Sequence, residues 1–279
     1  MLDLKQTDRM LKKLERFVDI IEPMIFEKVG ETGPVSALAT LERFHSIPEN
    51  SLFDPIEKGY KWGEEFGYCC FKTDFVVPDG LDGKDIFIRP HISCYEGTLW
   101  VDGVPYGNFC TKIVFTGHGN HYCDLLRKDA KAGDKIAIDL EYYAGHSYKG
   151  CHPTENLPLL TYDFSYEGID ICVKNYAVQE FYFDLRTLVQ LVKNLPDSSF
   201  RRASVINELE QVFREIYQSP DDVDRDEFMA ALERAKPYLK KALSVKNGDD
   251  APKAVLIGHS HMDTAWLWHV GETVKKCAR

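Results

Sequence analysis

The sequence lacks three features that identify common classes of protein. Its eight cysteines include no CxxC pair and follow no regular framework spacing. No stretch approaches the roughly 18 uncharged apolar residues of a membrane-spanning helix, so no membrane partner is expected. There is also no excess of positive charge, because 44 acidic and 34 basic residues give a formal net charge of -10. Such a balance argues against nucleic acid as a partner.

The N-terminal segment also lacks the signature of an exported protein. The segment MLDLKQTDRMLKKLERFVDI mixes charges with its apolar positions, whereas a signal peptide has an uninterrupted apolar core. A chain of 279 residues with 44% hydrophobic content can bury a core without disulfides. We therefore expect a cytoplasmic protein with free thiols, and four disulfides are the alternative.

Hydrophobic periodicity predicts an α+β multidomain protein. Met10, Leu14, Phe17 and Ile21 recur at helical spacing near the N-terminus, and residues 37–43 are a weaker helix candidate. The expected parts are an N-terminal helical arm at residues 1–57, a β-sandwich at 58–180, a helical linker region at 181–247 and the start of an α/β catalytic domain at 248–279.

Short apolar runs separated by glycine turns predict the β-domain. The runs are rich in β-branched and aromatic residues, and no helical pattern lies between them. This arrangement favours an antiparallel sandwich, such as a jelly roll, over a parallel sheet. Asp102-Gly103 is one of the expected hairpin turns. The strand candidates are residues 71–77, 86–92, 98–101, 113–116, 135–143 and 162–173.

Helical spacing returns after Glu180. Apolar stripes predict helices near residues 185–192, 205–216 and 227–243. Asp224 and Asp226 are suited to cap the first turn of the third, and Pro237 predicts a kink or a break within it. The polar segment KNGDDAPK then predicts a linker.

The apolar run at residues 254–257 predicts a buried strand, and a polar segment follows it. His261 and Asp263 are separated by one residue, so both side chains can face the same crevice. Imidazole nitrogen and carboxylate oxygen are zinc ligands, although two ligands alone cannot complete a site. The alternative is that Asp263 caps a helix starting near Thr264 and that His259 and His261 are ordinary loop residues.

The segment GHSHMDTAWLW followed by ETVKKCAR resembles the opening of the catalytic domain in glycoside hydrolase family 38, the class II α-mannosidases. The resemblance implies that His261 and Asp263 are zinc ligands and that Trp266 lines the mannose pocket. In that family a further His, the nucleophile Asp and the acid/base carboxylate lie downstream. No catalytic residue is therefore expected within these residues, the zinc site would be incomplete, and the chain alone would be inactive.

The resemblance also implies the activity of the parent enzyme. Family members remove terminal α-linked mannose from oligosaccharides with retention, which requires two carboxylates about 5 to 5.5 Å apart. The order of helix, β-domain and helical linker looks like the cytosolic and vacuolar branch, which agrees with a cytoplasmic location. The implied cofactor is zinc, although cobalt or manganese also suits these ligands. A homo-oligomer is compatible with the sequence.

Two alternatives remain open from the sequence. Trp100 and Tyr106 flank the Asp102-Gly103 turn, so the β-domain can be a carbohydrate-binding module, or these rings can pack between sheets in a scaffold. The whole chain can likewise be a non-catalytic carbohydrate-binding or oligomerisation module in which the His-x-Asp motif is incidental. A second metal site is also conceivable, with His118, His121, His146 and His152 as ligands near Cys123 and Cys151. The spacing of these residues does not match a known metal-binding motif.

Overall fold

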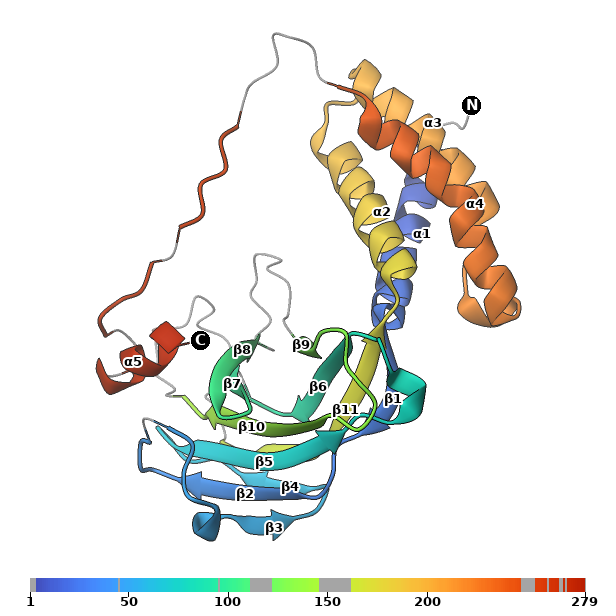
Figure 1. The fold of residues 1–279 in the computed structure, drawn as a ribbon. Helices are drawn as coiled ribbons and strands as arrows, with labels where there is room; N and C mark the ends of the chain where they lie inside the picture. Colours follow the sequence, from blue (N-terminus) through green and yellow to red (C-terminus); the bar gives the residue numbers. More distant parts are fainter. Residues whose placement is uncertain are drawn as a thin grey trace. The chain divides into compact units, whose positions relative to one another are not determined.

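The computed structural model describes residues 4–44, 46–94, 96–110, 122–145, 162–246, 254–259, 261–265, 268 and 270–278. The chain divides into two units, each assembled from separated stretches of sequence. The first unit combines Met1–Glu27 with Lys174–Ile257, and the second combines Lys28–Val173 with Gly258–Arg279. Helices dominate the first unit and antiparallel strands the second, so the chain has an α+β fold (Figure 1).

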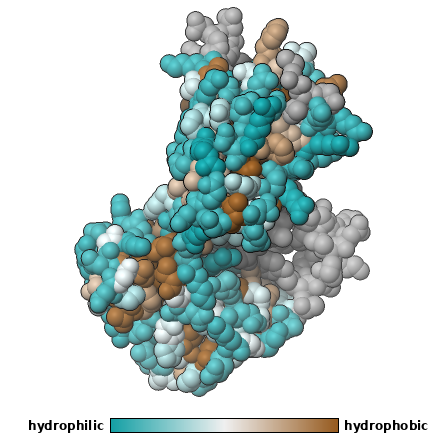
Figure 2. Space-filling view, turned by 90° about the vertical axis from the view of Figure 1, so that its right-hand side faces the viewer, coloured by the Kyte–Doolittle hydropathy of each residue, from teal (hydrophilic) through white to brown (hydrophobic). Residues whose placement is uncertain are grey.

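The face of the molecule drawn in Figure 2 is mainly hydrophilic. On the face drawn in Figure 2, hydrophilic side chains cover most of the area and hydrophobic ones gather in separate patches. This agrees with a charged content of 28%. Among the helices that the structure describes, none combines the length and the apolar character needed to cross a bilayer.

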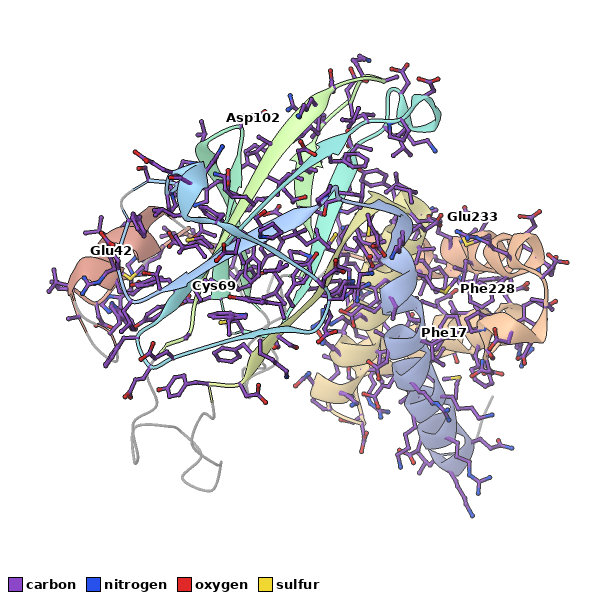
Figure 3. The ribbon with its side chains drawn as sticks, turned by 90° about the horizontal axis from the view of Figure 1, so that it is seen from below. Phe17, Glu42, Cys69, Asp102, Phe228 and Glu233 are labelled. Atoms are coloured by element: carbon purple, nitrogen blue, oxygen red, sulfur yellow. The ribbon has the colours of Figure 1, made fainter. Side chains whose placement is uncertain are left out.

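The first unit is a group of packed helices. In α1 the apolar residues Met10, Leu14, Phe17 and Ile21 are buried, as their helical spacing predicts. Buried stripes from the other helices meet the α1 stripe in one hydrophobic core. Phe17 faces Phe228 within this core (Figure 3). The helices are α1 (Leu4–Ile21), α2 (Tyr176–Asn194), α3 (Phe200–Glu215) and α4 (Arg225–Ser244), with 3₁₀ helices η1 (Glu22–Ile25) and η4 (Pro220–Asp222).

Polar caps fix where three of these helices begin. The side chains of Asn175, Ser199 and Asp224 each accept a hydrogen bond from a backbone N–H in the first turn of the helix that follows. The cap at Asp224 was expected from the sequence and is confirmed. The helix α4 continues through Pro237 to Ser244, so the expected disturbance does not end it.

The strands of the second unit form two sheets. One has the order β1-β11-β6-β9, with β4 also pairing β11, and the other has the order β3-β2-β5-β10-β7-β8. The strand pairs whose register is described are antiparallel. The strands are β1 (Phe26–Glu31), β2 (Val35–Thr40), β3 (Asp54–Ile56), β4 (Tyr60–Trp62), β5 (Tyr68–Val76), β6 (Ile86–Ile92), β7 (Glu96–Val101), β8 (Val104–Cys110), β9 (Asp124–Arg127), β10 (Lys135–Tyr143) and β11 (Phe164–Lys174), with 3₁₀ helices η2 (Asn50–Leu52) and η3 (Asp79–Leu81).

The two sheets face each other across one hydrophobic core, to which both contribute side chains. Trp62 of β4 meets Phe71 of β5 and Tyr142 of β10 edge to face, with ring centroids 6.3 and 6.5 Å apart. Phe71 also stacks on Tyr166 of β11 at 5.7 Å. Aromatic pairs therefore join the sheets across the core. The jelly-roll assignment itself stays a prediction.

The strand predictions agree with the structure where alternation was strong. The candidates at residues 86–92 and 135–143 coincide with β6 and β10, and three others overlap β5, β7 and β11. The candidate at residues 113–116 lies outside the described residues. Asp102 and Gly103 form the turn between β7 and β8 with φ values of 51° and 78°, as an Asp-Gly hairpin turn requires.

The segment expected to be a helical arm differs from the prediction. Its residues 26–56 contribute β1, β2 and β3, and the short helix expected at residues 37–43 is wrong because β2 occupies most of it. Ala37 pairs with Phe71 of β5, and Val35 and Ala37 alternate into the core. The two units also cross the expected boundaries at residues 57, 180 and 247, because α1 packs with the later helices.

The strand expected at residues 254–257 is absent from the structure, which has no regular element over residues 254–259. Val255, Leu256 and Ile257 are 81%, 96% and 82% exposed. A strand is held by hydrogen bonds to a neighbour, and an apolar run alone does not supply one. The following helix, α5 (Val270–Ala278), begins well beyond the expected start near Thr264.

Candidate metal-binding loop

The structure brings the two expected metal ligands together. His261 Nε2 lies 3.3 Å from Asp263 Oδ1, and their side chains are 73% and 47% exposed. Two atoms that each lie about 2.0 to 2.2 Å from a tetrahedral zinc are about 3.3 to 3.6 Å apart. The observed separation therefore fits two ligands of one metal ion. The helix α5 begins well beyond Asp263, so this carboxylate does not cap it.

The described residues supply this pair and no larger ligand set. Among the residues whose placement is described, no cluster of three or more His, Cys, Asp or Glu side chains can hold a metal ion. Catalytic zinc takes three protein ligands and keeps one position open. His261 and Asp263 therefore fit zinc as part of a larger set.

Hydrogen bonds connect this loop to α5. Thr273 Oγ1 donates to the carbonyl oxygen of Thr264, the residue that directly follows Asp263. Trp268 Nε1 donates to Thr273 Oγ1 at 3.0 Å. The backbone just after the second ligand is therefore held against the first turn of α5.

The helix α5 is held in turn by a buried carboxyl group. Glu272 is fully buried, and Tyr68 Oη donates to Glu272 Oε2 at 2.6 Å. Burial raises the pKa of Tyr68, and the hydrogen bond to Glu272 raises it further, so the phenol stays protonated as a donor. Sequence reasoning missed this pair because its partners are far apart in the chain, although Glu272 opens the ETVKKCAR segment.

Other site predictions have mixed outcomes. Trp266, expected to line a mannose pocket, lies outside the described residues, as does most of the second candidate metal cluster. Trp100 is partly buried, whereas Tyr106 is 49% exposed. None of the six cysteines whose side chains are described forms a disulfide, and Cys69 and Cys70 are buried in β5. The expectation of reduced thiols stays a prediction.

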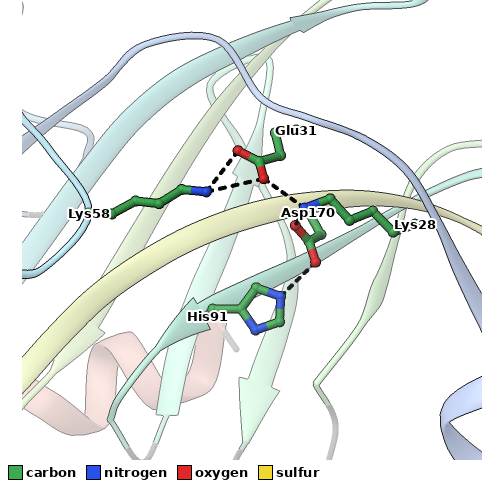
Figure 4. A network of polar contacts seen from close by, with 5 residues as sticks. All are labelled: Lys28, Glu31, Lys58, His91 and Asp170. Carbon is green, nitrogen blue, oxygen red and sulfur yellow. Dashed lines mark hydrogen bonds and ion pairs between the residues drawn. The ribbon is translucent and has the colours of Figure 1, made fainter.

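A charged network that the sequence did not predict lies on β1, β6, β11 and the turn before β4 (Figure 4). Lys28 Nζ lies 2.6 Å from Asp170 Oδ1, and His91 Nε2 lies 2.8 Å from Asp170 Oδ2. Burial would raise the pKa of Asp170, but the hydrogen bonds from Lys28 and His91 outweigh it and lower that pKa. Glu31 accepts from Lys28 and Lys58.

Both carboxylate oxygens of Asp170 are thus engaged, one by the Lys28 ammonium group and one by the His91 ring, so the network ties strands together and is a poor candidate for catalysis. Lys28 and Glu31 share β1, and the other members lie on separate elements. The pairing of β11 with β6 is what brings them close. The spacing of these residues along the sequence therefore did not predict the charged network.

Comparison with known proteins identifies the relatives of the chain. Alpha-mannosidase G of Dictyostelium discoideum is 26% identical over 99% of this chain, and alpha-mannosidase 2C1 is 23% identical in Mus musculus and 22% in Homo sapiens. The resemblance to the class II α-mannosidases is confirmed. The match extends over helices, sheets and loop alike, and so beyond the motif near residue 261 on which the expectation rested.

The chain spans about a quarter of the length of these α-mannosidases, since it covers 25% to 26% of each. No protein-family model matches it. Among solved structures, β-glucuronidases from Ruminococcus gnavus and Faecalibacterium prausnitzii match 53% and 54% of this chain and 28% and 32% of their own, at 12% and 9% identity. Their TM-scores of 0.34 and 0.36 are too low to establish a common fold.

Proposed function

We propose that this chain is the N-terminal part of a retaining, zinc-dependent α-mannosidase that releases terminal α-linked mannose from oligosaccharides. The observation that carries the proposal is the match to α-mannosidases over 99% of the chain, together with the 3.3 Å approach of His261 to Asp263. The match supports the family, and the approach supports a metal at this loop.

In this proposal His261 and Asp263 are two of the ligands of the zinc. His261 offers the lone pair of Nε2, which requires a neutral ring, and Asp263 offers a carboxylate oxygen. When bound, zinc supplies a Lewis acid that engages sugar hydroxyl groups. Trp266 offers an aromatic face against which the apolar side of a mannose ring can stack.

The remaining chemistry is proposed to come from other residues of the same polypeptide. Retention requires a nucleophilic carboxylate and an acid/base carboxylate about 5 to 5.5 Å apart. The relatives are about four times longer than this chain, which leaves room for those groups. We therefore propose that this chain alone does not turn over substrate. A cytoplasmic location is proposed because the six described cysteines form no disulfide.

The test uses the full polypeptide that carries this chain. It should hydrolyse an aryl α-mannoside but not the matching β-mannoside, lose turnover after dialysis against a chelator and regain it with zinc. Proton NMR should find the α-anomer of mannose as the first product. Turnover that persists without metal would contradict zinc dependence, and a β-anomer as first product would contradict retention. Absence of α-mannoside cleavage in the zinc-loaded protein would overturn the proposed activity.

A further inference from the structure

A hydrogen bond from Tyr68 of β5 to Glu272 connects β5 to the helix α5, which is labelled in Figure 1. Of its side chains that the structure describes, Glu272 is the one that is buried. Val270 and Val274 are 59% and 58% exposed, and Cys277 is exposed as well. A helix normally docks through its apolar residues, and burying a carboxylate is costly unless hydrogen bonds replace its water. Among the side chains of α5 that are described, the buried one therefore makes a polar contact with β5.

Tyr68 supplies one hydrogen bond to this carboxylate. Its hydroxyl lies 2.6 Å from Glu272 Oε2, a length typical of a strong O–H···O⁻ bond. Tyr68 is a rigid donor, because it is 2% exposed and its ring lies 5.0 Å from that of Tyr143 on β10. The strand β5 pairs with β2 on one side and β10 on the other, so Tyr68 belongs to the interior of the sheet.

The anchored helix holds the metal-binding loop. Thr273 follows Glu272 directly, and its hydroxyl donates to the carbonyl oxygen of Thr264. Thr264 follows Asp263 directly, and Asp263 lies 3.3 Å from His261. A continuous series of contacts therefore runs from β5 through α5 to the two expected ligands. The ligand side chains themselves are exposed, so much of their placement depends on this backbone support.

We propose that the hydrogen bond between Tyr68 and Glu272 positions the metal-binding loop, so that the β-domain sets the geometry of the site. This inference rests on the proposed function. In this proposal neither Tyr68 nor Glu272 contacts the metal or the substrate, so both are positioning residues. Outer partners of metal ligands typically affect metal affinity or activity by about 10- to 100-fold.

The test compares variants of the full polypeptide. Glu272→Ala removes the acceptor, Tyr68→Phe removes the donor, and Glu272→Gln keeps an oxygen that can accept from Tyr68. Tyr166→Phe is the matched control, because Tyr166 is a buried β-domain tyrosine that stacks on Phe71. Zinc affinity is measured by competition with a chromophoric chelator, and kcat and KM for an aryl α-mannoside are measured at limiting and at saturating zinc.

Glu272→Ala and Tyr68→Phe should weaken zinc binding and lower kcat/KM at limiting zinc by about 10- to 100-fold. Saturating zinc should restore much of the loss, which a purely structural defect would not allow. Glu272→Gln should retain more affinity than Glu272→Ala, and Tyr166→Phe should match the unmodified protein. Hydrogen exchange of residues 270–278 should accelerate in Glu272→Ala.

The outcomes separate this inference from the proposed function. An unmodified protein without zinc-dependent mannosidase activity would overturn the function, while zinc affinity and hydrogen exchange would still test the anchor. An active protein whose Glu272→Ala and Tyr68→Phe variants keep full zinc affinity and kcat/KM would overturn the positioning role alone. Should Glu272→Ala fail to fold, Tyr68→Phe carries the test, because it removes a single hydroxyl group.

Discussion

Truncating Phe17 should strongly destabilise the helical unit. Phe17 is fully buried in α1, and its ring lies 6.4 Å from Phe181 of α2 and 6.1 Å from Phe228 of α4 (Figure 3). Replacing a buried Phe by Ala typically costs about 3 to 5 kcal/mol through lost burial and the cavity left behind. We expect the upper part of that range, because the two partner rings stand on different helices and cannot both close the cavity.

Urea unfolding followed by far-ultraviolet circular dichroism measures this loss. The four tryptophans all lie in the second unit, so their fluorescence reports on the β-domain in the same titration. Phe200→Ala is the control, because Phe200 is a helical Phe that is 94% exposed, and surface changes stay within about 0.5 kcal/mol. Equal effects of Phe17→Ala and Phe200→Ala would refute a shared core of α1, α2 and α4.

Three further predictions concern the caps, the pH and the metal. Asp224→Ala should destabilise α4 by about 0.5 to 2 kcal/mol in chemical denaturation, because the Asp224 side chain accepts a hydrogen bond from the backbone N–H of Glu227. Asp224→Asn should be nearly neutral, because Asn can accept the same bond. Hydrogen bonds from Lys236 and Lys240 lower the pKa of Glu180 to about 2 from its ordinary value of 4.5. Glu180 should therefore stabilise the protein above pH 4.5, and this stabilisation should fade as the pH falls toward 2. The free energy of unfolding of Glu180→Gln should be lower than that of the unmodified protein at neutral pH and equal to it near pH 2. Calorimetry on this chain alone should find weak zinc binding, and assays should find no α-mannoside turnover; tight one-to-one binding would contradict an incomplete ligand set.

Patterns within a single segment predicted its helix or strand correctly wherever apolar residues recurred at a regular spacing. The alternation in residues 135–143 predicted β10 because Ile136, Ile138, Leu140 and Tyr142 all face the core. The same approach failed for β2, whose Ser and Ala residues have little preference for a strand. That strand exists because β5 pairs with it, and such pairing is not visible in a single segment.

Only the pair of expected ligands in the proposed site was predictable from the sequence. The spacing of His261 and Asp263 predicted that they face the same side, and the structure brings them to 3.3 Å. The support behind them was not predictable, because Tyr68 and Glu272 are separated by most of the chain and meet only through the fold. The sequence reveals functional residues that lie close together in the chain. It does not reveal residues that support a site through tertiary contacts.

Alanine substitution of both His261 and Asp263 in the full polypeptide tests the central claim most directly. His259→Ala is the matched control, because His259 is an exposed imidazole that precedes the same loop and is not an expected ligand. With zinc supplied, the double variant should lose more than the roughly 100-fold in kcat/KM that outer partners of a metal cost, while His259→Ala keeps its activity. Mannosidase turnover that survives the loss of both ligands would contradict the account.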